Sequence, residues 1–135
     1  ELISIIKTNR NAAIVMDSDK KSSRAHINDT KKRIIKEFDD MSMMSWVTKG
    51  KEIENYIPKA VIEAALGIKL NKQCGQFELF PGYIEPYYHG FTGKKVKFAR
   101  AIAAHMTLDN MADMMDVKQQ VKAIVERIAR WNGWI

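Results

Sequence analysis

The hydrophobic residues of this chain fall into short runs that polar turn residues separate. Residues 12–16 form an apolar run between polar segments, which predicts a short buried strand. Residues 45–48 predict a second strand, which Gly50 ends. Residues 2–7 form a further apolar stretch, which is compatible with the end of a short helix or with a strand.

A basic segment between the two predicted strands has the spacing of an amphipathic helix. Asp29 or Thr30 is placed to cap this helix, and Ile34, Ile35 and Phe38 share its inner face. A strand, a helix and a strand in this order predict a parallel pair joined by a right-handed crossover. The sequence therefore predicts an α/β fold with a parallel sheet flanked by helices.

The second half of the chain is predicted to be helical around an irregular loop. Pro58 suits the first turn of a helix that runs to Leu66 and ends at Gly67. Residues 71–93 are rich in aromatic residues, glycine and proline, which predicts a loop with one short strand near residues 77–80.

Two further helices are predicted at the C-terminal end. Residues 95–106 have an alanine-rich face, and residues 116–119 have the form of a capping box that opens the last helix. The apolar stripe of that helix favours a core face, with a docking face for a partner as the alternative. The stripe consists of Val117, Val121, Ile124, Val125, Ile128 and Trp131. We expect one domain, with an acidic core at about 11–66, an aromatic loop at 71–93 and C-terminal helices at 95–132.

Composition limits the class of protein. The chain has 135 residues, of which 46% are hydrophobic and 28% charged, as is typical of one soluble globular domain. No apolar run is long enough to cross a membrane, and the first residues do not resemble a signal peptide. A single cysteine, Cys74, cannot form an internal disulfide, which favours the cytoplasm. Because the chain starts at Glu1 and enters apolar sequence at once, we expect it to be a piece of a longer polypeptide.

The net charge of +6 favours a polyanionic partner such as DNA. Seven basic residues lie between Lys20 and Lys36 against one acid, and four lie between Lys94 and Arg100. Each cluster is compatible with a solvated surface, but the first begins beside an acidic pair, which favours contact with phosphate. The residues expected to contact nucleic acid are Lys20, Lys21, Arg24, Lys94 and Lys95.

Two acidic triplets carry the candidate chemistry. Asp17-Ser18-Asp19 follows the first predicted strand, and Glu52-Ile53-Glu54 comes just after the second. The carboxyl ends of parallel neighbours meet at one edge of a sheet, where open α/β sheets bind ligands. Four carboxylates at this edge repel one another unless about two divalent cations lie between them, and oxygen ligands suit Mg²⁺ or Mn²⁺. Paired cations of this kind assist phosphodiester cleavage. The alternative is that Glu52 and Glu54 are surface acids at the start of a helix.

Other side chains extend or limit this hypothesis. A lysine from a separate helix, for which Lys97 is the candidate and Lys94 and Lys95 are the alternatives, could stabilise negative charge on the phosphate undergoing cleavage. The three histidines lack the spacing of a zinc site, and no histidine is placed to activate Cys74 as a nucleophile. The sequence contains no glycine-rich phosphate loop, so it does not bind ATP through such a motif of its own.

Two segments carry a resemblance to a known family. Residues 14–20, Ile-Val-Met-Asp-Ser-Asp-Lys, and residues 46–58, which include Glu-Ile-Glu-Asn-Tyr, resemble the Toprim (topoisomerase-primase) nuclease domain of the OLD (overcoming lysogenization defect) family. Members of this family are ATP-dependent endonucleases, several of them in anti-phage defence. The resemblance implies a mostly parallel sheet flanked by helices that cleaves or nicks DNA with two divalent metals.

The resemblance also assigns roles to individual residues. Asp17 and Asp19 match the family's Asp-x-Asp/Glu metal motif, Glu52 and Glu54 match its second acidic motif, and Lys97 corresponds to its charge-stabilising lysine. Toprim domains begin with a strand that carries an essential glutamate, and in this family an ATPase module precedes them. Neither is visible here, which implies that the chain is the later part of the domain, that it need not be active alone, and that ATP acts only through the missing module. The implied partners are DNA, a second copy of the full-length protein and a partner protein of a defence system.

Two other functions stay open. One is a non-catalytic regulatory module in which a degenerate Toprim site binds nucleic acid or a partner protein. The other is a Toprim relative of another kind, such as a primase or recombination-mediator domain, against which the Glu-Ile-Glu-Asn-Tyr segment argues.

Overall fold

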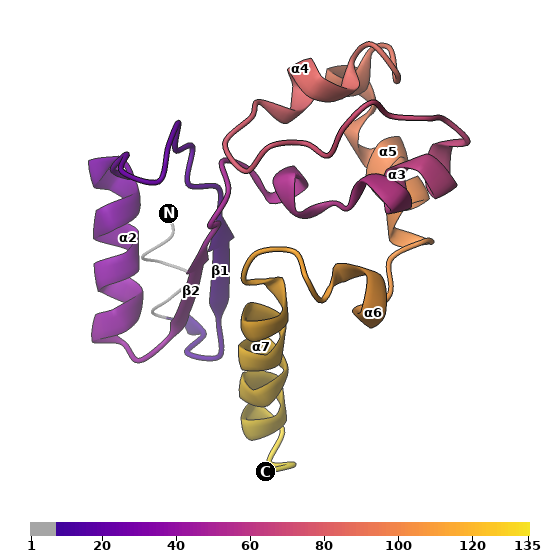
Figure 1. Cartoon of the computed structure of the whole chain (residues 1–135). Coiled ribbons are helices and arrows are strands. Elements are labelled where there is room, and N and C mark those ends of the chain that lie inside the picture. Colours follow the sequence, from indigo (N-terminus) through magenta and orange to yellow (C-terminus); the bar gives the residue numbers. More distant parts are fainter. Residues whose placement is uncertain (1–7) are drawn as a thin grey trace.

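A parallel pair of strands lies at the centre of the N-terminal half of the molecule (Figure 1). The structure is a computed structural model that describes residues 8–135, so the apolar stretch at 2–7 lies outside the described residues. Strand β1 (Ala13–Met16) pairs with β2 (Met44–Val47), and helix α2 (Asp29–Asp40) connects them. Both predicted strands, their parallel pairing and the intervening helix are confirmed. The fold is α/β, with a small two-stranded parallel sheet flanked by helices and a C-terminal helix.

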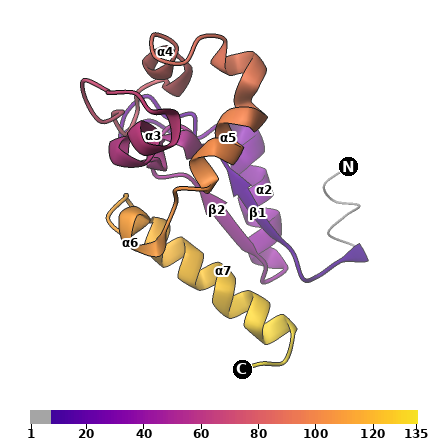
Figure 2. The same cartoon turned by 90° about the vertical axis from the view of Figure 1, so that its right-hand side faces the viewer.

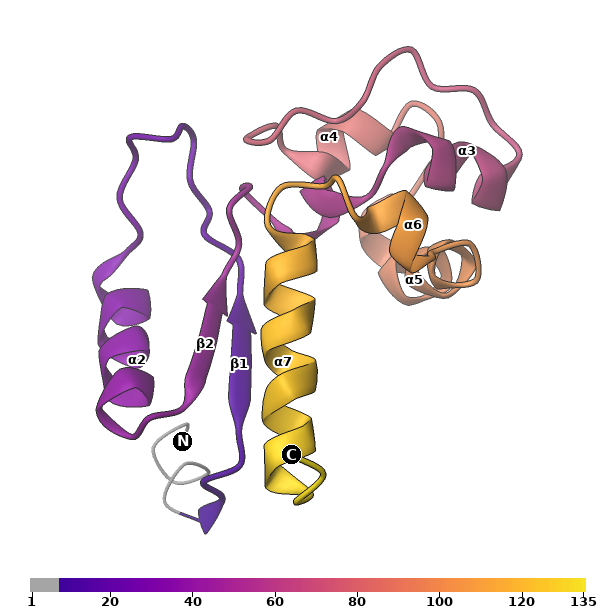
Figure 3. The ribbon, with the colours of Figure 1, turned by 60° about the horizontal axis from the view of Figure 1, so that its bottom comes forward.

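Helices α2 and α7 (Val117–Trp131) lie on opposite sides of the strand pair (Figures 1 and 3). On the α2 side, Phe38 and Met43 form a small core against Ala12, Ile14 and Ile34. On the other side, a second core joins the strands to α7 and the segment before it. Its buried members are Met44, Trp46 and Tyr56, against which Met111, Met114, Met115, Val117, Ala123 and Ile124 pack.

Strand β1 is not buried as the apolar run predicted. Its residues alternate between exposed and half-buried, and Val15 is 46% exposed. The register aligns Val15 with Trp46, so both side chains project from the same face of the sheet. On that face the core contains Met44 and Trp46 of β2 and no residue of β1, so Trp46 is covered whereas Val15 is not.

The cap of α2 is Asn28, so the prediction of Asp29 or Thr30 was wrong. Asn28 has an extended backbone, with φ −69° and ψ 162°, and its side chain accepts a hydrogen bond from Lys31 N at 2.8 Å. Three neighbouring residues are chemically able to cap this helix. The path of the loop that enters the helix decides which of the three residues takes the extended conformation of the cap.

The largest core lies beyond the carboxyl ends of the strands, among α3 (Lys59–Leu66), α4 (Phe80–Ile84) and α5 (Lys95–Ala103) (Figures 1 and 2). Three aromatic rings lie at its centre: Phe98 lies 5.7 Å from Phe80 and 5.0 Å from Phe91, between ring centroids. Helix α3 ends as predicted, at Gly67 in the left-handed conformation with φ 63°.

The short strand predicted near residues 77–80 is absent, because α4 begins at Phe80. Pro81 lies in the first turn of α4, where its fixed φ favours a helix and its missing N–H is not needed. The buried Phe80 ring then anchors this helix in the core.

Helix α5 ends at Ala103, three residues before the predicted end. Thr107 starts the short helix α6 (Leu108–Met111), because its hydroxyl accepts from Asn110 N at 3.1 Å while the Asn110 side chain accepts from Thr107 N at 2.8 Å. This reciprocal cap competes with the continuation of α5.

Helix α7 begins at Val117 as predicted, but Asp116 forms no capping box. Instead the Asp116 carboxylate accepts from the hydroxyl of Tyr56 and, at 3.2 Å, from Gln120 Nε2. The predicted core face is confirmed in part: Val117 and Ile124 contact the Trp46 core, whereas Val125 is 57% exposed. No helix of the described chain is long and apolar enough to span a membrane.

Candidate active site at the carboxyl ends of the strands

A buried hydrogen-bond network holds the two strand ends together. Ser18 N donates to Thr48 Oγ1 at 2.9 Å, and both hydroxyls donate to the carbonyl of Gly50, at 2.5 Å from Ser18 and 2.9 Å from Thr48. At the next residue of each segment, Asp19 N donates to Lys51 O at 2.9 Å. Because Ser18 and Thr48 are 2% and 3% exposed, the network is shielded from water and fixes the two acidic triplets next to each other.

Asp17 joins the two triplets directly. Its Oδ1 accepts a hydrogen bond of 2.8 Å from Ile53 N, the central residue of the second triplet. Ile53 begins the 3₁₀ turn η1 (Ile53–Tyr56), so the Asp17 carboxylate lies at the amino end of this turn. Both acidic triplets therefore meet at one edge of the sheet, as the sequence predicted.

Glu52 is held by the backbone around it. Its own N–H donates to Asn55 Oδ1 at 2.7 Å, and its Oε2 accepts from Phe80 N, the first residue of α4, at 3.0 Å. The Asn55 side chain is fully buried and donates from Nδ2 to Gly75 O and Glu78 O, each at 2.9 Å. These bonds tie the second acidic triplet to the aromatic half of the chain.

Glu54 is the half-buried acid of the site. Burial raises the pKa of its carboxyl, a backbone hydrogen bond and the Lys95 ammonium lower it, and the charges of Asp17 and Glu52 raise it further. Lys95 Nζ lies 3.9 Å from Glu54 Oε1. Three of the four predicted acids therefore share one electrostatic environment, with a single lysine opposite them.

Asp19 pairs with a different partner. The backbone of Asp19 has a positive φ of 54°, and its carboxylate forms an ion pair with Lys31 of α2. Lys31 Nζ also donates to the Asp17 backbone oxygen at 2.5 Å. The Asp19 side chain is 62% exposed. Its charge is thus matched by Lys31, and no local pattern in the sequence indicates that Lys31 lies here.

The carboxylates suit a hard divalent cation by their chemistry, since all donors are oxygen. Within the described part of the chain, however, no three His, Cys, Asp or Glu side chains are grouped closely enough to hold a metal ion. Asp17 and Glu52 each accept a hydrogen bond from a backbone N–H through one carboxylate oxygen, and Asp19 is paired with Lys31. The donors fit Mg²⁺ or Mn²⁺, but they are not arranged as a ready ligand set.

Among the lysines of the second basic cluster, Lys95 is the one beside the acids. Lys94 Nζ donates to His89 O at 3.0 Å and lies 5.8 Å from the centre of the Tyr88 ring. Lys97 is exposed, and its side chain makes no hydrogen bond or ion pair with the described residues. The role expected for Lys97 stays a prediction, and the geometry offers Lys95 for that role instead. The preceding 3₁₀ turn η2 (Phe91–Lys94) sets which lysine faces the site, and no local pattern announces that turn.

The basic residues predicted to contact nucleic acid occupy two surfaces. Lys20 borders a cavity beside the strand ends, while Lys21 and Arg24 are exposed in the loop that follows. Lys94 and Lys95, together with Lys97 and Arg100, line a shallow hollow at the start of α5.

No family model, curated protein or solved structure matches this chain.

Proposed function

We propose that this chain is part of a metal-dependent DNA endonuclease, a Toprim-type nuclease unit of the OLD family, that nicks or cleaves phosphodiester bonds. The observation that carries the proposal is the meeting of two acidic triplets at the carboxyl edge of a parallel strand pair, through the bond from Ile53 N to Asp17 Oδ1. In this proposal ATP acts only through a module outside this sequence, and the protein works as a homo-oligomer in anti-phage defence.

Asp17, Glu52 and Glu54 would hold the metal, and Asp19 would join them once its pair with Lys31 opens. A bound divalent cation would polarise a phosphate oxygen of the substrate and activate a water molecule. Burial and the neighbouring carboxylates raise the pKa of Glu54, which marks a place where added positive charge is favourable. Lys95, 3.9 Å from Glu54, is placed to stabilise negative charge on a phosphate at this edge.

Metal binding and DNA nicking test this proposal together. Mn²⁺ binding is measured by calorimetry for the unmodified chain, for Asp17→Asn and for Glu54→Gln, and nicking of supercoiled plasmid with Mg²⁺ or Mn²⁺ is followed with the same substitutions in the full-length protein. We expect each substitution to weaken Mn²⁺ binding at least about tenfold and to abolish nicking. Asp109→Asn, an exposed acid of α6, is the matched control and should change neither. The proposal fails if the unmodified chain binds no Mn²⁺, or if both site variants bind and nick as it does.

The two candidate lysines are separated by the same nicking assay. Lys95→Gln should reduce nicking more than Lys97→Gln, because only Lys95 lies beside the acids. The reverse order would restore the assignment that the family resemblance implies.

A second function is a non-catalytic module that binds nucleic acid or a partner protein. It is favoured by the Asp19–Lys31 pair and by the absence, among the described residues, of a grouped ligand set. DNA affinity that persists in chelator, from a chain that binds no Mn²⁺, would select this alternative.

A further inference from the structure

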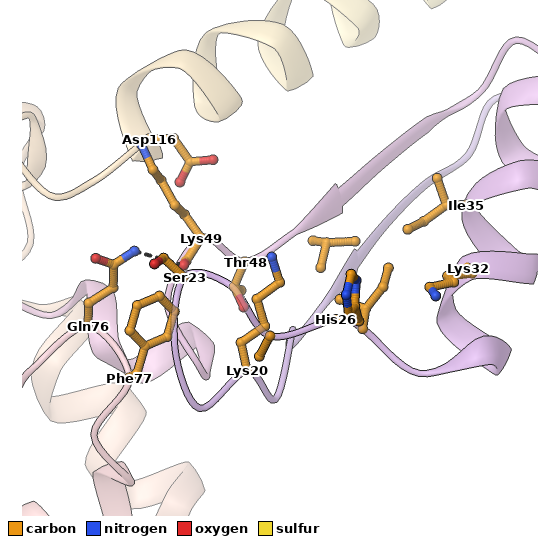
Figure 4. Close-up of a pocket in the computed structure, with 13 residues that line it drawn as sticks. Lys20, Ser23, His26, Lys32, Ile35, Thr48, Lys49, Gln76, Phe77 and Asp116 are labelled. Carbon is orange, nitrogen blue, oxygen red and sulfur yellow. Dashed lines mark hydrogen bonds between the residues drawn. The ribbon is translucent and has the colours of Figure 1, made fainter.

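A cavity lies next to the acidic edge, between the end of β2, the N-terminal part of α2 and the loop at residues 76–77 (Figure 4). Its volume is about 510 Å³, which is within the range of small-ligand cavities, roughly 300–1,000 Å³. The residues that give it its character are Lys20, His26, Lys32, Lys49, Phe77 and Asp116. None of the acidic triplet residues lines it.

The cavity is positively charged. Neither Lys20 nor Lys49 forms an ion pair with any described residue, and Lys32 lies 4.0 Å from the exposed Asp29. The one carboxylate of the lining, Asp116, already accepts hydrogen bonds from the Tyr56 hydroxyl and from Gln120. Lys20, Lys32 and Lys49 therefore give the lining three positive charges, the only acid among the lining residues is engaged elsewhere, and this balance favours an anionic ligand.

An aromatic ring forms one wall. Figure 4 places Phe77 on one side of the cavity and His26 on the other, with Lys20 between them. Phe77 is half-buried, so part of its ring is open to a ligand. A flat aromatic face beside cationic side chains is the combination that binds unpaired bases and their phosphates.

The wall that carries Phe77 is fixed to the strand ends. Gln76 O accepts from Lys51 N at 2.9 Å, and Gln76 Nε2 donates to Lys49 O at 3.0 Å. A Cβ at Gly50 would lie only 2.8 Å from Gln76 O, so glycine there permits this close approach. The backbone next to Phe77 is therefore positioned before any ligand arrives, which lowers the entropy lost on binding.

The cavity and the acidic edge share a boundary. Thr48 lines the cavity, and its hydroxyl accepts from Ser18 N, in the middle of the first acidic triplet. A polynucleotide strand that crosses the acidic edge can thus place a neighbouring nucleotide in the cavity without leaving the surface.

We propose that this cavity binds one unpaired nucleotide of single-stranded DNA, with its phosphate beside Lys20 and its base against Phe77. The inference rests on the proposed function for its choice of ligand, but not on metal binding or cleavage. In a duplex each base is stacked and paired, so neither face is free to meet Phe77. The cavity therefore makes the protein prefer single-stranded over duplex DNA.

Fluorescence anisotropy with a short labelled oligothymidylate, and with a hairpin duplex of equal phosphate number, tests this inference in the presence of chelator. We expect the oligothymidylate to bind more tightly than the hairpin. Phe77→Leu should weaken oligothymidylate binding about tenfold with an unchanged salt dependence. Lys20→Gln should weaken it and reduce the slope of log K against log salt by about 0.7, the value for one phosphate contact on a single strand. Phe77→Tyr, which keeps the ring, should bind as the unmodified chain does, and its recovery excludes misfolding as the cause.

Lys69→Gln removes an exposed lysine that lies outside the cavity and should leave both affinity and salt slope unchanged. Equal binding by Phe77→Leu and the unmodified chain, tighter binding to the hairpin, or no binding to either probe would each overturn the inference. The result is independent of the nuclease proposal, because binding is measured in chelator and none of the acidic triplet residues lines the cavity. Loss of nicking without a change in these affinities would leave the cavity assignment intact.

Discussion

Asn55 connects the second acidic triplet with the aromatic half of the chain, and its replacement by alanine tests that connection. The side chain is 1% exposed and serves three backbone groups: it accepts from Glu52 N and donates to Gly75 O and Glu78 O. It also lies 3.4 Å from Cys74 Sγ. Alanine would remove all three hydrogen bonds, and Glu52 N and Glu78 O would lose their partner, whereas Gly75 O would keep its bond from Glu78 N.

The cost follows from these contacts. Each hydrogen bond contributes about 1 kcal/mol, so the loss of three predicts a decrease of about 3 kcal/mol in the free energy of unfolding. For a domain whose total stability is about 5–15 kcal/mol, this is a large fraction. The triplet would also lose the bond that orients Glu52, so Glu54 would lose its fixed position opposite Lys95.

Urea unfolding followed by tryptophan fluorescence measures this change, since Trp46 is buried in the folded chain. Asn71→Ala is the matched control, because Asn71 is exposed and makes no hydrogen bond with the described residues. A free energy of unfolding for Asn55→Ala within about 0.5 kcal/mol of the control would refute the reasoning. It would mean that water replaces the amide and that the two halves are connected by apolar packing alone.

Three further predictions concern pH, packing and reactivity. Because the pKa of Glu54 is raised, the folded chain binds the proton of this carboxyl more tightly than the unfolded chain does, and the free energy of unfolding falls as the pH rises above 4.5, the ordinary pKa of glutamate. Glu54→Gln should remove this fall and raise the melting temperature at pH 7. An unchanged dependence of stability on pH would contradict the prediction. Gly50→Ala should lower the free energy of unfolding by about 1–3 kcal/mol, because the added Cβ would meet Gln76 O at 2.8 Å, whereas Gly93→Ala, where no atom lies within 4 Å, should be nearly neutral in the same urea titration. Burial raises the pKa of the Cys74 thiol to about 11, so a thiol reagent at pH 8 should react with the native chain only at the rate of unfolding, and rapid labelling would show that Cys74 is accessible.

The strand pair and the meeting of the acidic triplets followed from the sequence because their signals are local. Short apolar runs ended by polar residues mark the strands, and parallel pairing then brings their carboxyl ends to one edge. Gly67 likewise marked the end of α3, since a left-handed position favours glycine.

The partners of the acids could not be predicted in this way. The pairing of Asp19 with Lys31 depends on how α2 crosses the sheet, and the choice of Lys95 over Lys97 depends on a 3₁₀ turn before α5. The helix at Phe80 was also missed, because an aromatic run is compatible with a strand until its place in the core is known. Each of these features is decided by contacts between segments far apart in the chain.

The bond between Ile53 and Asp17 spans 36 positions of the chain, and this separation bears on how the protein folds. Closing so long a loop costs entropy before any contact compensates for it. We therefore expect the acidic edge to form together with, or after, the crossover helix α2 that lies within this loop. A one-residue slip of β2 along β1 would turn Trp46 away from its core and, in the same step, remove the Thr48 hydroxyl from Ser18. A misaligned chain therefore loses its packing together with the hydrogen bonds at its acidic edge, which leaves little opportunity for a stable misaligned conformer to accumulate.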